Sequence, residues 1–309
     1  MSGALSRYAG KFSSVRVAVV GDYIADEFIH GDTSRISREA PVLVLDFRRR
    51  EVIPGGGGNA AMNAASLGGQ VAALGALGNG GTGQDLCEAL GRRRIDTRLL
   101  LADPGRVTPT KTRIMAGGRN TARQQVIRVD HEERLPLRAE LEGKIVAAIG
   151  RLAAGGADAI IVSDYGLGVV TPAVREAVQA AARKIIVTVD SRHAGDSFRG
   201  VTAITPNEEE AEALLGFWPE EDRLDEAGAT LLERTRAQGV LITRGSQGMS
   251  LFERGLPRKD IPIYGTDQIA DVTGAGDTVI AAFTLALAAG ATMAEAAEIA
   301  NRAAGIVVM

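Results

Sequence analysis

The sequence contains little cysteine and little histidine, and both shortages exclude classes of protein. Its 309 residues include one cysteine, Cys87, so an internal disulfide is excluded and a reducing compartment is indicated. The three histidines, His30, His131 and His193, lie far apart in the chain and lack the spacing of Cys/His ligands. A zinc site is therefore not predicted.

The sequence also lacks a charge excess and a long hydrophobic run. Its formal net charge is −3, with 35 basic and 38 acidic residues, which argues against a nucleic-acid partner. The most apolar stretch, residues 279–291, has 13 residues, and a span of the bilayer needs roughly 20. The first 14 residues lack the apolar core of a signal peptide. We therefore expect a cytoplasmic protein without a membrane partner.

Short apolar runs alternate with Ala- and Leu-rich stretches along the chain. The β-branched runs predict buried parallel strands at residues 15–20, 71–77, 159–162, 185–189, 201–205 and 240–243. The stretches between them predict helices, for example at 137–152, 172–183 and 222–238. This alternation indicates an α/β fold with a mostly parallel sheet flanked by helices on both faces.

Two arginine-rich segments interrupt the alternation. Residues 41–53 and 110–130 are extended and partly alternating, and neither carries the apolar stripe of a helix. We predict that both are strands of a small sheet, inserted into the α/β body and folded over a cleft. Because no linker or internal repeat is present, we expect residues 1–309 to form one domain.

Glycine is abundant, and its 38 residues gather in clusters. Residues 271–277 (DVTGAGD) precede a predicted buried helix at 278–287. The first N–H groups of a helix lack internal partners and carry a positive partial charge, so this segment could cradle a phosphate. Asp277 could then accept the proton of an attacking hydroxyl. The alternative is an ordinary helix start with an acid beside the dipole.

Two other glycine clusters have different interpretations. Residues 55–58 are four consecutive glycines that allow a ligand to approach, and Asn59 adds an amide, so we favour a ligand contact over a flexible turn. Residues 78–83 (GNGGTG) match a dinucleotide fingerprint weakly, because no acidic residue follows about 20 residues later. We predict a loop there. A nicotinamide-dependent oxidoreductase that binds NADH is the alternative built on this segment.

Another helix is predicted to begin after the run at 201–205. Thr205 is a candidate N-cap, Pro206 fits the first turn, and Glu208 completes a capping box. Asn207 and Glu210 lie three residues apart and could hold a hydrated Mg²⁺ ion.

Acidic and polar residues follow two predicted strands. Asp22 and Asp26 come after the first strand, where open α/β sheets bind ligands, and their carboxylates suit sugar hydroxyls. The alternative is a turn residue and a surface acid. Residues 243–248 follow another strand and suit a nucleotide contact, although alone they indicate only a hairpin.

Together these segments resemble the ribokinase-like (PfkB) sugar kinases, from about residue 15 to the C-terminus. Residues 55–59 are similar to the family's N-terminal signature, and 271–277 are similar to its C-terminal signature. Residues 207–210 are similar to its Mg-nucleotide motif. The resemblance implies a doubly wound, ribokinase-like α/β fold with a small inserted β-sheet lid.

Three segments resemble more narrowly the members that phosphorylate O1 of D-glycero-β-D-manno-heptose 7-phosphate, a step toward ADP-heptose and lipopolysaccharide: 31–42, 163–166 and 271–278. Those kinases usually have Lys at the position of Leu167. They usually have Asp-Pro-Lys where this chain has Asp followed by Ser191 and Arg192.

The resemblance implies a role for each matching residue. The implied catalytic groups are the base Asp277 and the amides of Gly274, Ala275 and Gly276. The implied nucleotide site comprises Asn207, Glu208, Glu209, Glu210, Thr243, Gly245, Gly248 and Asn301. Of these residues, Asn207 and Glu210 would order Mg²⁺ through water. The implied sugar site comprises Asp22, Asp26, Gly55, Gly56 and Asn59. Candidates for a substrate phosphate, or else for a solvated or interface-facing basic strand, are Arg35, Lys111 and Arg113.

The resemblance also implies ligands and partners. ATP and Mg²⁺ are the implied cofactors, and relatives often bind K⁺ near 271–277, a question that these residues leave open. A homodimer through the lid is implied. Because the chain ends at Met309, we expect no nucleotidyltransferase domain of the kind that bifunctional relatives carry. Two alternatives remain: a kinase for another sugar or sugar phosphate, such as a fructose phosphate, and a catalytically silent sugar-binding regulator.

Overall fold

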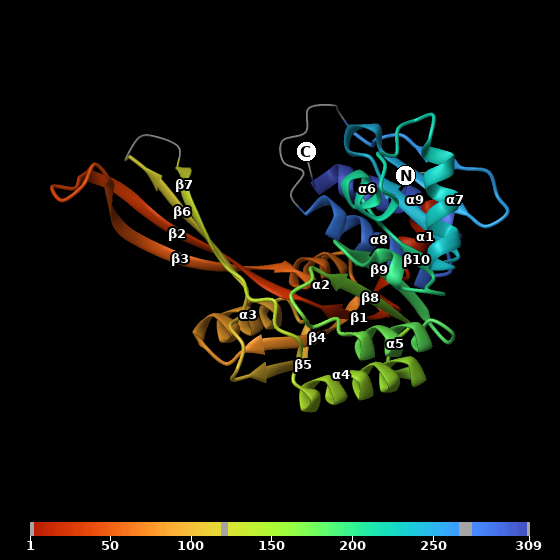
Figure 1. Cartoon of the computed structure of the whole chain (residues 1–309), viewed down its shortest axis with the longest axis horizontal. Helices are drawn as coiled ribbons and strands as arrows, with labels where there is room; N and C mark the ends of the chain where they lie inside the picture. Colours follow the sequence, from red (N-terminus) through yellow and green to blue (C-terminus); the bar gives the residue numbers. More distant parts are fainter. Residues whose placement is uncertain (1–2, 119–122, 266–273, 308–309) are drawn as a thin grey trace.

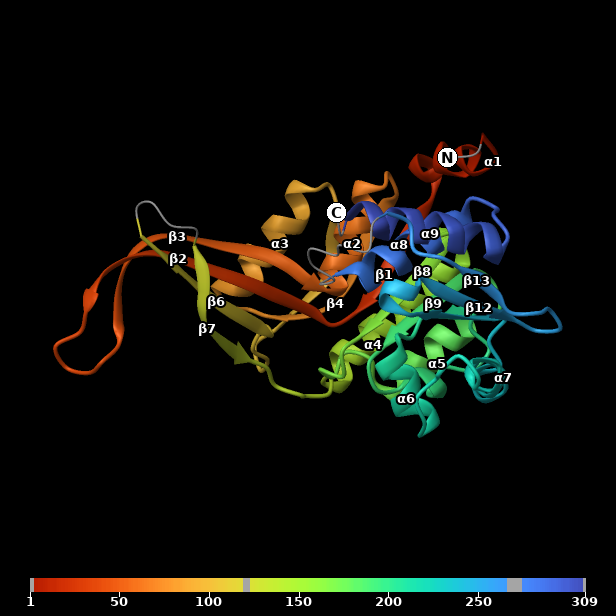
Figure 2. The same cartoon turned by 90° about the horizontal axis from the view of Figure 1, so that it is seen from above.

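The structure is a computed structural model that describes residues 3–118, 123–265 and 274–307. A body of helices around a nine-stranded sheet carries a second, four-stranded sheet that extends away from it (Figure 1). The view from above shows the same projecting arm (Figure 2). Within the described ranges, no helix is long and apolar enough to cross a bilayer.

Each of the six predicted apolar runs contributes a strand to the nine-stranded sheet, but only Ala203–Ile204 of the run at 201–205 is strand. Its strand order is β13-β12-β11-β10-β9-β8-β1-β4-β5, with parallel neighbours from β11 to β5 and antiparallel pairing of β12 and β13 at one edge. Three strands near the edges, β5, β12 and β13, lack a long apolar run and were not predicted. The strands are β1 (Arg16–Gly21), β4 (Gln70–Gly78), β5 (Asp96–Asp103), β8 (Ala159–Asp164), β9 (Ile186–Ser191), β10 (Ala203–Ile204), β11 (Gly239–Thr243), β12 (Met249–Glu253) and β13 (Lys259–Ile261).

Helices cover both faces of this sheet because its buried strands are apolar on both faces. In β1, Val17 and Val19 pack into one hydrophobic cluster, and Ala18 and Val20 pack into the other. The first cluster contains side chains from α1 (Gly3–Ala9), α2 (Gly57–Ser66), α3 (Gly81–Arg92), α8 (Ala275–Ala288) and α9 (Met293–Val307). The second contains side chains from α4 (Ala139–Arg151), α5 (Pro172–Ala181), α6 (Glu208–Leu215) and α7 (Leu224–Thr235). The predicted fold class is confirmed.

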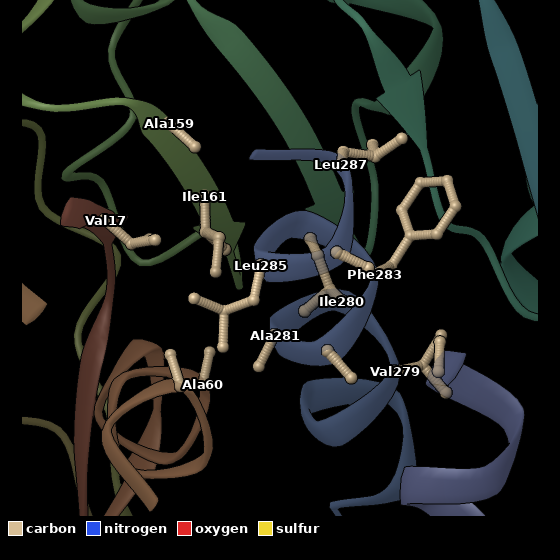
Figure 3. Close-up of a cluster of buried hydrophobic side chains, with 14 of the residues drawn as sticks. Val17, Ala60, Ala159, Ile161, Val279, Ile280, Ala281, Phe283, Leu285 and Leu287 are labelled. Carbon is tan, nitrogen blue, oxygen red and sulfur yellow. The ribbon is translucent and has the colours of Figure 1, made fainter. Parts of the chain in front are cut away.

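Helix α8 is the central helix of the first cluster. It contacts α2, α9, β8 and β9, and its residues are buried from Asp277 to Leu287. Figure 3 shows Ile280 and Leu285 of this helix packed near Val17 and Ile161 of the sheet. This packing fixes the start of α8 relative to the carboxyl ends of β8 and β9.

The second sheet is the predicted lid, enlarged by one long strand. Its order is β3-β2-β6-β7, formed by β2 (Tyr23–Ile36), β3 (Leu43–Gly56), β6 (Thr110–Gly117) and β7 (Gln124–His131). The two predicted segments supply β3, β6 and β7. Strand β2 begins directly after β1, so the chain passes from the main sheet into the lid at Asp22.

The segment at 78–83 is not the loop that the sequence predicted, since α3 begins within it at Gly81. A Cβ atom at Gly78 would lie 2.5 Å from the Arg106 carbonyl oxygen. A Cβ atom at Gly83 would lie 2.2 Å from the Gly78 carbonyl oxygen. Close backbone packing therefore accounts for two of these glycines without a dinucleotide.

Candidate active site

The start of α8 leaves backbone amides available. Gly274 is the N-cap in a left-handed conformation (φ 83°), and Thr278 donates to its carbonyl oxygen at 3.1 Å. Within the described ranges, the amides of Ala275 and Gly276 have no hydrogen-bond partner. Residues 271–273 of the predicted signature lie outside those ranges. The described part of the predicted anion site thus has two hydrogen-bond donors, the amides of Ala275 and Gly276.

Asp277 lies in the first turn of α8 and is 7% exposed. Asn59, at the start of α2, donates from Nδ2 to its Oδ2 at 2.7 Å. The hydroxyl of Tyr165, just after β8, lies 3.5 Å from its Oδ1. Burial raises the pKa of Asp277 to about 6, opposed by these two hydrogen bonds and by the charge of Arg192. A carboxylate of that basicity can accept a proton near neutral pH.

Two further carboxylates lie near Asp277. Asp190 belongs to β9 and Glu210 to the first turn of α6. Burial raises the pKa of Asp190 well above its ordinary value, and the charges of Glu210 and Asp277 add to that rise. Burial also raises the pKa of Glu210. Three carboxyl groups therefore share this site, and burial disfavours the ionised form of each. Their ionised forms would repel a phosphate ligand unless cations offset the charge.

A cavity of about 420 Å³ adjoins the start of α8. Its lining includes seven of the eight residues predicted for the nucleotide, together with two of the predicted anion-site residues: Asn207, Glu208, Glu209, Thr243, Gly245, Gly248, Asn301, Ala275 and Gly276. Sequence reasoning missed the remaining lining residues, which are Trp218, Met249, Ile263, Val279, Ala304 and Gly305. The single tryptophan was the one available signal, and its side chain is 40% exposed.

The capping box of α6 differs from the predicted one. Asn207, not Thr205, is the N-cap: its Oδ1 accepts from the amide of Glu210 at 2.8 Å. The Oε2 atom of Glu210 accepts from the amide of Asn207 at 3.0 Å. The amide of Thr205 donates instead to the Val189 carbonyl oxygen in β9 at 3.0 Å, which removes it from the helix.

The capping box leaves limited capacity for a metal ion. The Oε1 atom of Glu210 has no partner within the described part of the chain. No group of three or more His, Cys, Asp or Glu side chains there could hold a metal ion alone. Because Mg²⁺ commonly keeps several waters and shares the oxygens of nucleotide phosphates, Asn207 and Glu210 fit it as water-mediated partners.

The predicted sugar site falls partly on the lid. Asp26 in β2 forms an ion pair with Arg113 in β6. A Cβ atom at Gly55 would lie 2.3 Å from the Oδ2 atom of Asp26, so only glycine fits against this carboxylate. Lys111 lies 3.3 Å from Glu132, with its Nζ and Oε1 atoms paired. Acids thus already pair with Lys111 and Arg113, the two cations of β6.

The prediction that Asp22 binds the sugar is wrong. Its side chain is 1% exposed, and its carboxylate accepts three backbone amides. Tyr165 and Leu167 donate to Oδ2 at 2.9 and 3.0 Å, and Val169 donates to Oδ1 at 3.1 Å. Asp22 therefore orders the loop after β8. The backbone carbonyl of Asp22 also lies 2.7 Å from where a Cβ atom at Gly56 would stand.

Arg35 does not join the site of its own chain. It lies near the far end of β2 and is exposed. It follows Asp26 by nine residues on the same strand, a distance of roughly 30 Å at the rise of an extended chain. Within one chain, Arg35 is too remote to contact a phosphate held near Asp277.

Gly274→Ala tests whether the close approach of α8 to α2 matters. The added Cβ atom would lie 2.7 Å from the Nδ2 atom of Asn59, and the left-handed backbone would be strained by about 1–2 kcal/mol. We expect kcat to fall about tenfold, because the Asn59–Asp277 bond is displaced. Steady-state kinetics and thermal unfolding measure both effects.

Gly290→Ala is the matched control for this variant. Gly290 also has a positive φ (93°), beyond the other end of α8, but a Cβ atom there meets nothing within 4 Å. We expect a similar loss of stability with unchanged kcat. Equal kcat values in the two variants would contradict the role given to the Gly274–Asn59 contact.

Several known proteins are similar in sequence to nearly the whole of this chain. Two proteins named bifunctional protein HldE, from Pelobacter propionicus and Geobacter metallireducens, are both 42% identical to this chain, over 304 and 298 residues. The matches cover 96% and 95% of this chain but 61% and 59% of those proteins, so the chain spans about three fifths of their length.

Solved structures share the fold at low identity. Phosphofructokinase-2 from Escherichia coli, in complex with substrates and products, is 19% identical with a TM-score of 0.75, over 95% of this chain and 93% of that one. Arabidopsis thaliana ribokinase, complexed with ribose and ATP, is 20% identical with a TM-score of 0.70, over 95% and 92%.

The ribokinase-like fold and the sequence relationship together define a phosphotransferase that acts on sugars. The pfkB family of carbohydrate kinases matches residues 15–309. The chain belongs to this family and is a sugar kinase. The alternatives of a nicotinamide-dependent oxidoreductase and a silent regulator are not favoured by these relationships.

Proposed function

We propose that this kinase transfers the γ-phosphoryl group of ATP to O1 of D-glycero-β-D-manno-heptose 7-phosphate. The observation that carries the chemistry is the position of Asp277, which is buried next to a cavity large enough for a nucleotide. It lies beside helix amides that have no partner among the residues that the structure describes. The HldE relatives, similar over nearly the whole of this chain, support the choice of sugar.

In the proposed mechanism, Asp277 takes the proton of the sugar hydroxyl as that oxygen attacks the γ-phosphorus in line. Asn59 holds the carboxylate oriented through its hydrogen bond to Oδ2. The amides of Ala275 and Gly276 donate to the phosphoryl oxygens, where negative charge develops. Mg²⁺, when bound with the nucleotide through Asn207 and Glu210, supplies further positive charge to the phosphates.

The cavity beside α8 is the proposed nucleotide site. Trp218 offers an aromatic face to a base, and Thr243 offers a hydroxyl at the end of β11. Asn301 donates to the Pro262 carbonyl oxygen at 2.7 Å and so fixes one wall of the cavity. On the other side of Asp277, we propose that Asp26 and Arg113 bind the sugar phosphate, and that the lid limits hydrolysis by excluding water.

A kinase for another sugar phosphate, such as a fructose phosphate, is the second candidate. It is favoured by the replacements at Ser191 and Arg192, which lie beside the acid cluster formed by Asp190, Glu210 and Asp277. The replacement at Leu167 carries less weight, because this side chain is buried and its backbone amide binds Asp22.

A panel of sugars and sugar phosphates, followed by ADP release, distinguishes these candidates. We expect the largest kcat/KM with the heptose 7-phosphate and a value at least tenfold lower with fructose 6-phosphate. A reversed order would favour the second candidate. Sugar binding without ADP release by any member of the panel would indicate a silent regulator.

We further propose that the chain forms a homodimer through its lid. The lid exposes several large apolar side chains that a second copy would cover: Ile36, Val42, Leu43, Phe47, Val126, Ile127 and Val129. Phe47 is 65% exposed.

We expect sedimentation equilibrium to give a dimer for the wild type and a monomer for Phe47→Asp. Leu256→Asp, an exposed position outside the lid, is the control and is expected to stay dimeric. A monomeric wild type, or a tetramer unaffected by Phe47→Asp, would contradict the proposal.

A further inference from the structure

Arg192 is an unassigned cation at the edge of the acid cluster. Its side chain is exposed, and its guanidinium carbon lies 4.6 Å from the centre of the Tyr165 ring. Tyr165 is the residue whose hydroxyl lies 3.5 Å from the Oδ1 atom of Asp277. Within the described ranges, Arg192 forms no ion pair. The guanidinium therefore keeps its donors available.

The backbone of Arg192 is fixed to the neighbouring strand. Its amide donates to the Asp164 carbonyl oxygen at 3.0 Å. The hydroxyl of Ser191 donates to the Oδ2 atom of Asp164 at 2.8 Å and accepts from the amide of Ala194 at 3.1 Å. The turn after β9 is thus tied to the end of β8. Stacking on Tyr165 further restricts the guanidinium.

The charge of Arg192 acts on all three carboxylates of the cluster. Burial raises the pKa values of Asp190, Glu210 and Asp277, and in each case Arg192 opposes the rise. Among the described residues, the lid cations Lys111 and Arg113 already pair with Glu132 and Asp26. Arg192 is therefore the cation best placed for an anion that arrives beside Asp277.

We propose that Arg192 is a catalytic residue whose guanidinium binds the γ-phosphoryl group of ATP as it moves to the acceptor. This inference rests on the proposed function. In that reaction, the bond between the γ-phosphorus and the β–γ bridging oxygen breaks, and a bond from the sugar oxygen to the γ-phosphorus forms. The hydroxyl proton goes to Asp277 and ADP leaves. Arg192 donates to the non-bridging oxygens, and its planar fork suits two of them.

The placement of Arg192 favours the transferred group over a phosphate carried by the sugar. Arg192 lies at the carboxyl end of β9, on the side of Glu210 and Asp277. The lid residues Lys111 and Arg113 lie beside Asp26, where we propose that the sugar phosphate binds. The two sources of phosphate therefore predict different kinetic effects.

Arg192→Met removes the charge and keeps an apolar stem over Tyr165. Without any sugar, we expect calorimetry to give about fivefold weaker ATP binding and unchanged ADP binding, the loss of about one charge-assisted hydrogen bond. With the best sugar phosphate of the panel, we expect kcat to fall about 100-fold or more and its KM to change less than threefold. We expect Arg192→Lys, which keeps the charge, to retain more activity than Arg192→Met.

Several results would overturn this assignment. One is an equal weakening of ATP binding and ADP binding in Arg192→Met, or no weakening of either. Another is a loss confined to the KM of the sugar phosphate, which would assign Arg192 to the acceptor. Equal kcat values for the Lys and Met variants would exclude a role for the charge. Arg7→Met is the matched control, because Arg7 lies 4.7 Å over the ring of Tyr8, remote from the site; we expect wild-type kinetics.

The nucleotide measurement separates this inference from the proposed function. If the wild type releases no ADP with any sugar, the proposed function fails, while the ATP/ADP comparison still supports or overturns the contact between Arg192 and the γ-phosphoryl group. Thermal unfolding of each variant in the absence of ligand verifies that the comparison is made on folded protein.

Discussion

Asp277→Asn is expected to lower kcat for sugar phosphorylation by about 10³-fold while ATP affinity stays within threefold. An amide of the same shape cannot accept the proton, and general-base catalysis contributes roughly 10²–10⁴. The amides at the start of α8 and the nucleotide cavity remain unchanged, so the binding energy for ATP is preserved. Single-turnover kinetics and calorimetry with ATP measure the two effects.

Glu140→Gln is the control for this substitution. Glu140 is also an acid in the first turn of a helix, α4, but it is exposed and pairs with Lys144 at 2.6 Å. We expect its kcat to equal that of the wild type. A kcat for Asp277→Asn within tenfold of the wild type would contradict the role of Asp277 as the base.

The pKa of Asp277 gives the pH dependence of the same residue. Burial raises this pKa to about 6, so kcat/KM should be constant above about pH 7 and fall tenfold per pH unit well below 6. The folded-state pKa of about 6 lies above the ordinary value of 3.8. The stability that Asp277 contributes is therefore fully present below pH 3.8 and is lost as the pH rises through about 6, where the buried carboxylate ionises. We therefore expect Asp277→Asn to unfold at a higher temperature than the wild type at pH 8, and at a similar one at pH 4.

Asp22→Asn is expected to lower the free energy of unfolding by about 3 kcal/mol. The carboxylate accepts the amides of Tyr165, Leu167 and Val169, and an Asn side chain would turn a donor toward at least one of them. Burial raises the pKa of Asp22 and the three amides oppose that rise, so the charge itself adds no stability. The loss comes from the buried amide that is left without an acceptor, which costs up to about 3 kcal/mol. Urea denaturation followed by circular dichroism measures the change.

Asp26→Asn is the matched comparison, because the two acids stand four residues apart at the same transition from β1 to the lid. We expect a more than tenfold rise in the KM of the sugar phosphate, with stability reduced by less than 1 kcal/mol for this partly exposed pair. The opposite pattern, with a binding defect in Asp22→Asn and an unstable Asp26→Asn, would contradict the roles assigned to the two acids.

The main sheet could be predicted from the sequence because its strands are buried on both faces. Continuous β-branched runs are specific to such strands, and each of the six runs contributes a strand to the sheet. The strands β5, β12 and β13 lie at or next to the edges of the sheet and lack long apolar runs. Only their pairing with neighbours distinguishes them from loops. Glycines and polar residues after strands were sufficient signals to predict seven residues that line one cavity.

Long-range pairing explains the failures. Asp22 and Asp26 both follow a strand. Only the loop after β8, more than 140 residues away, shows that the carboxylate of Asp22 accepts hydrogen bonds from backbone amides. Two pairs, Thr205/Glu208 and Asn207/Glu210, fit a capping box equally well, because the members of each pair are three residues apart. The bond of Thr205 to β9 decides between them, and no local pattern contains it.

The most direct test of the account is ³¹P NMR of the reaction of the purified chain with ATP, Mg²⁺ and D-glycero-β-D-manno-heptose 7-phosphate, for the wild type and Asp277→Asn. We predict one new anomeric phosphate resonance for each ADP formed by the wild type, and less than about 1% of that rate for the variant. An absent anomeric phosphate in the wild type, or its formation at a similar rate in the variant, would contradict the account.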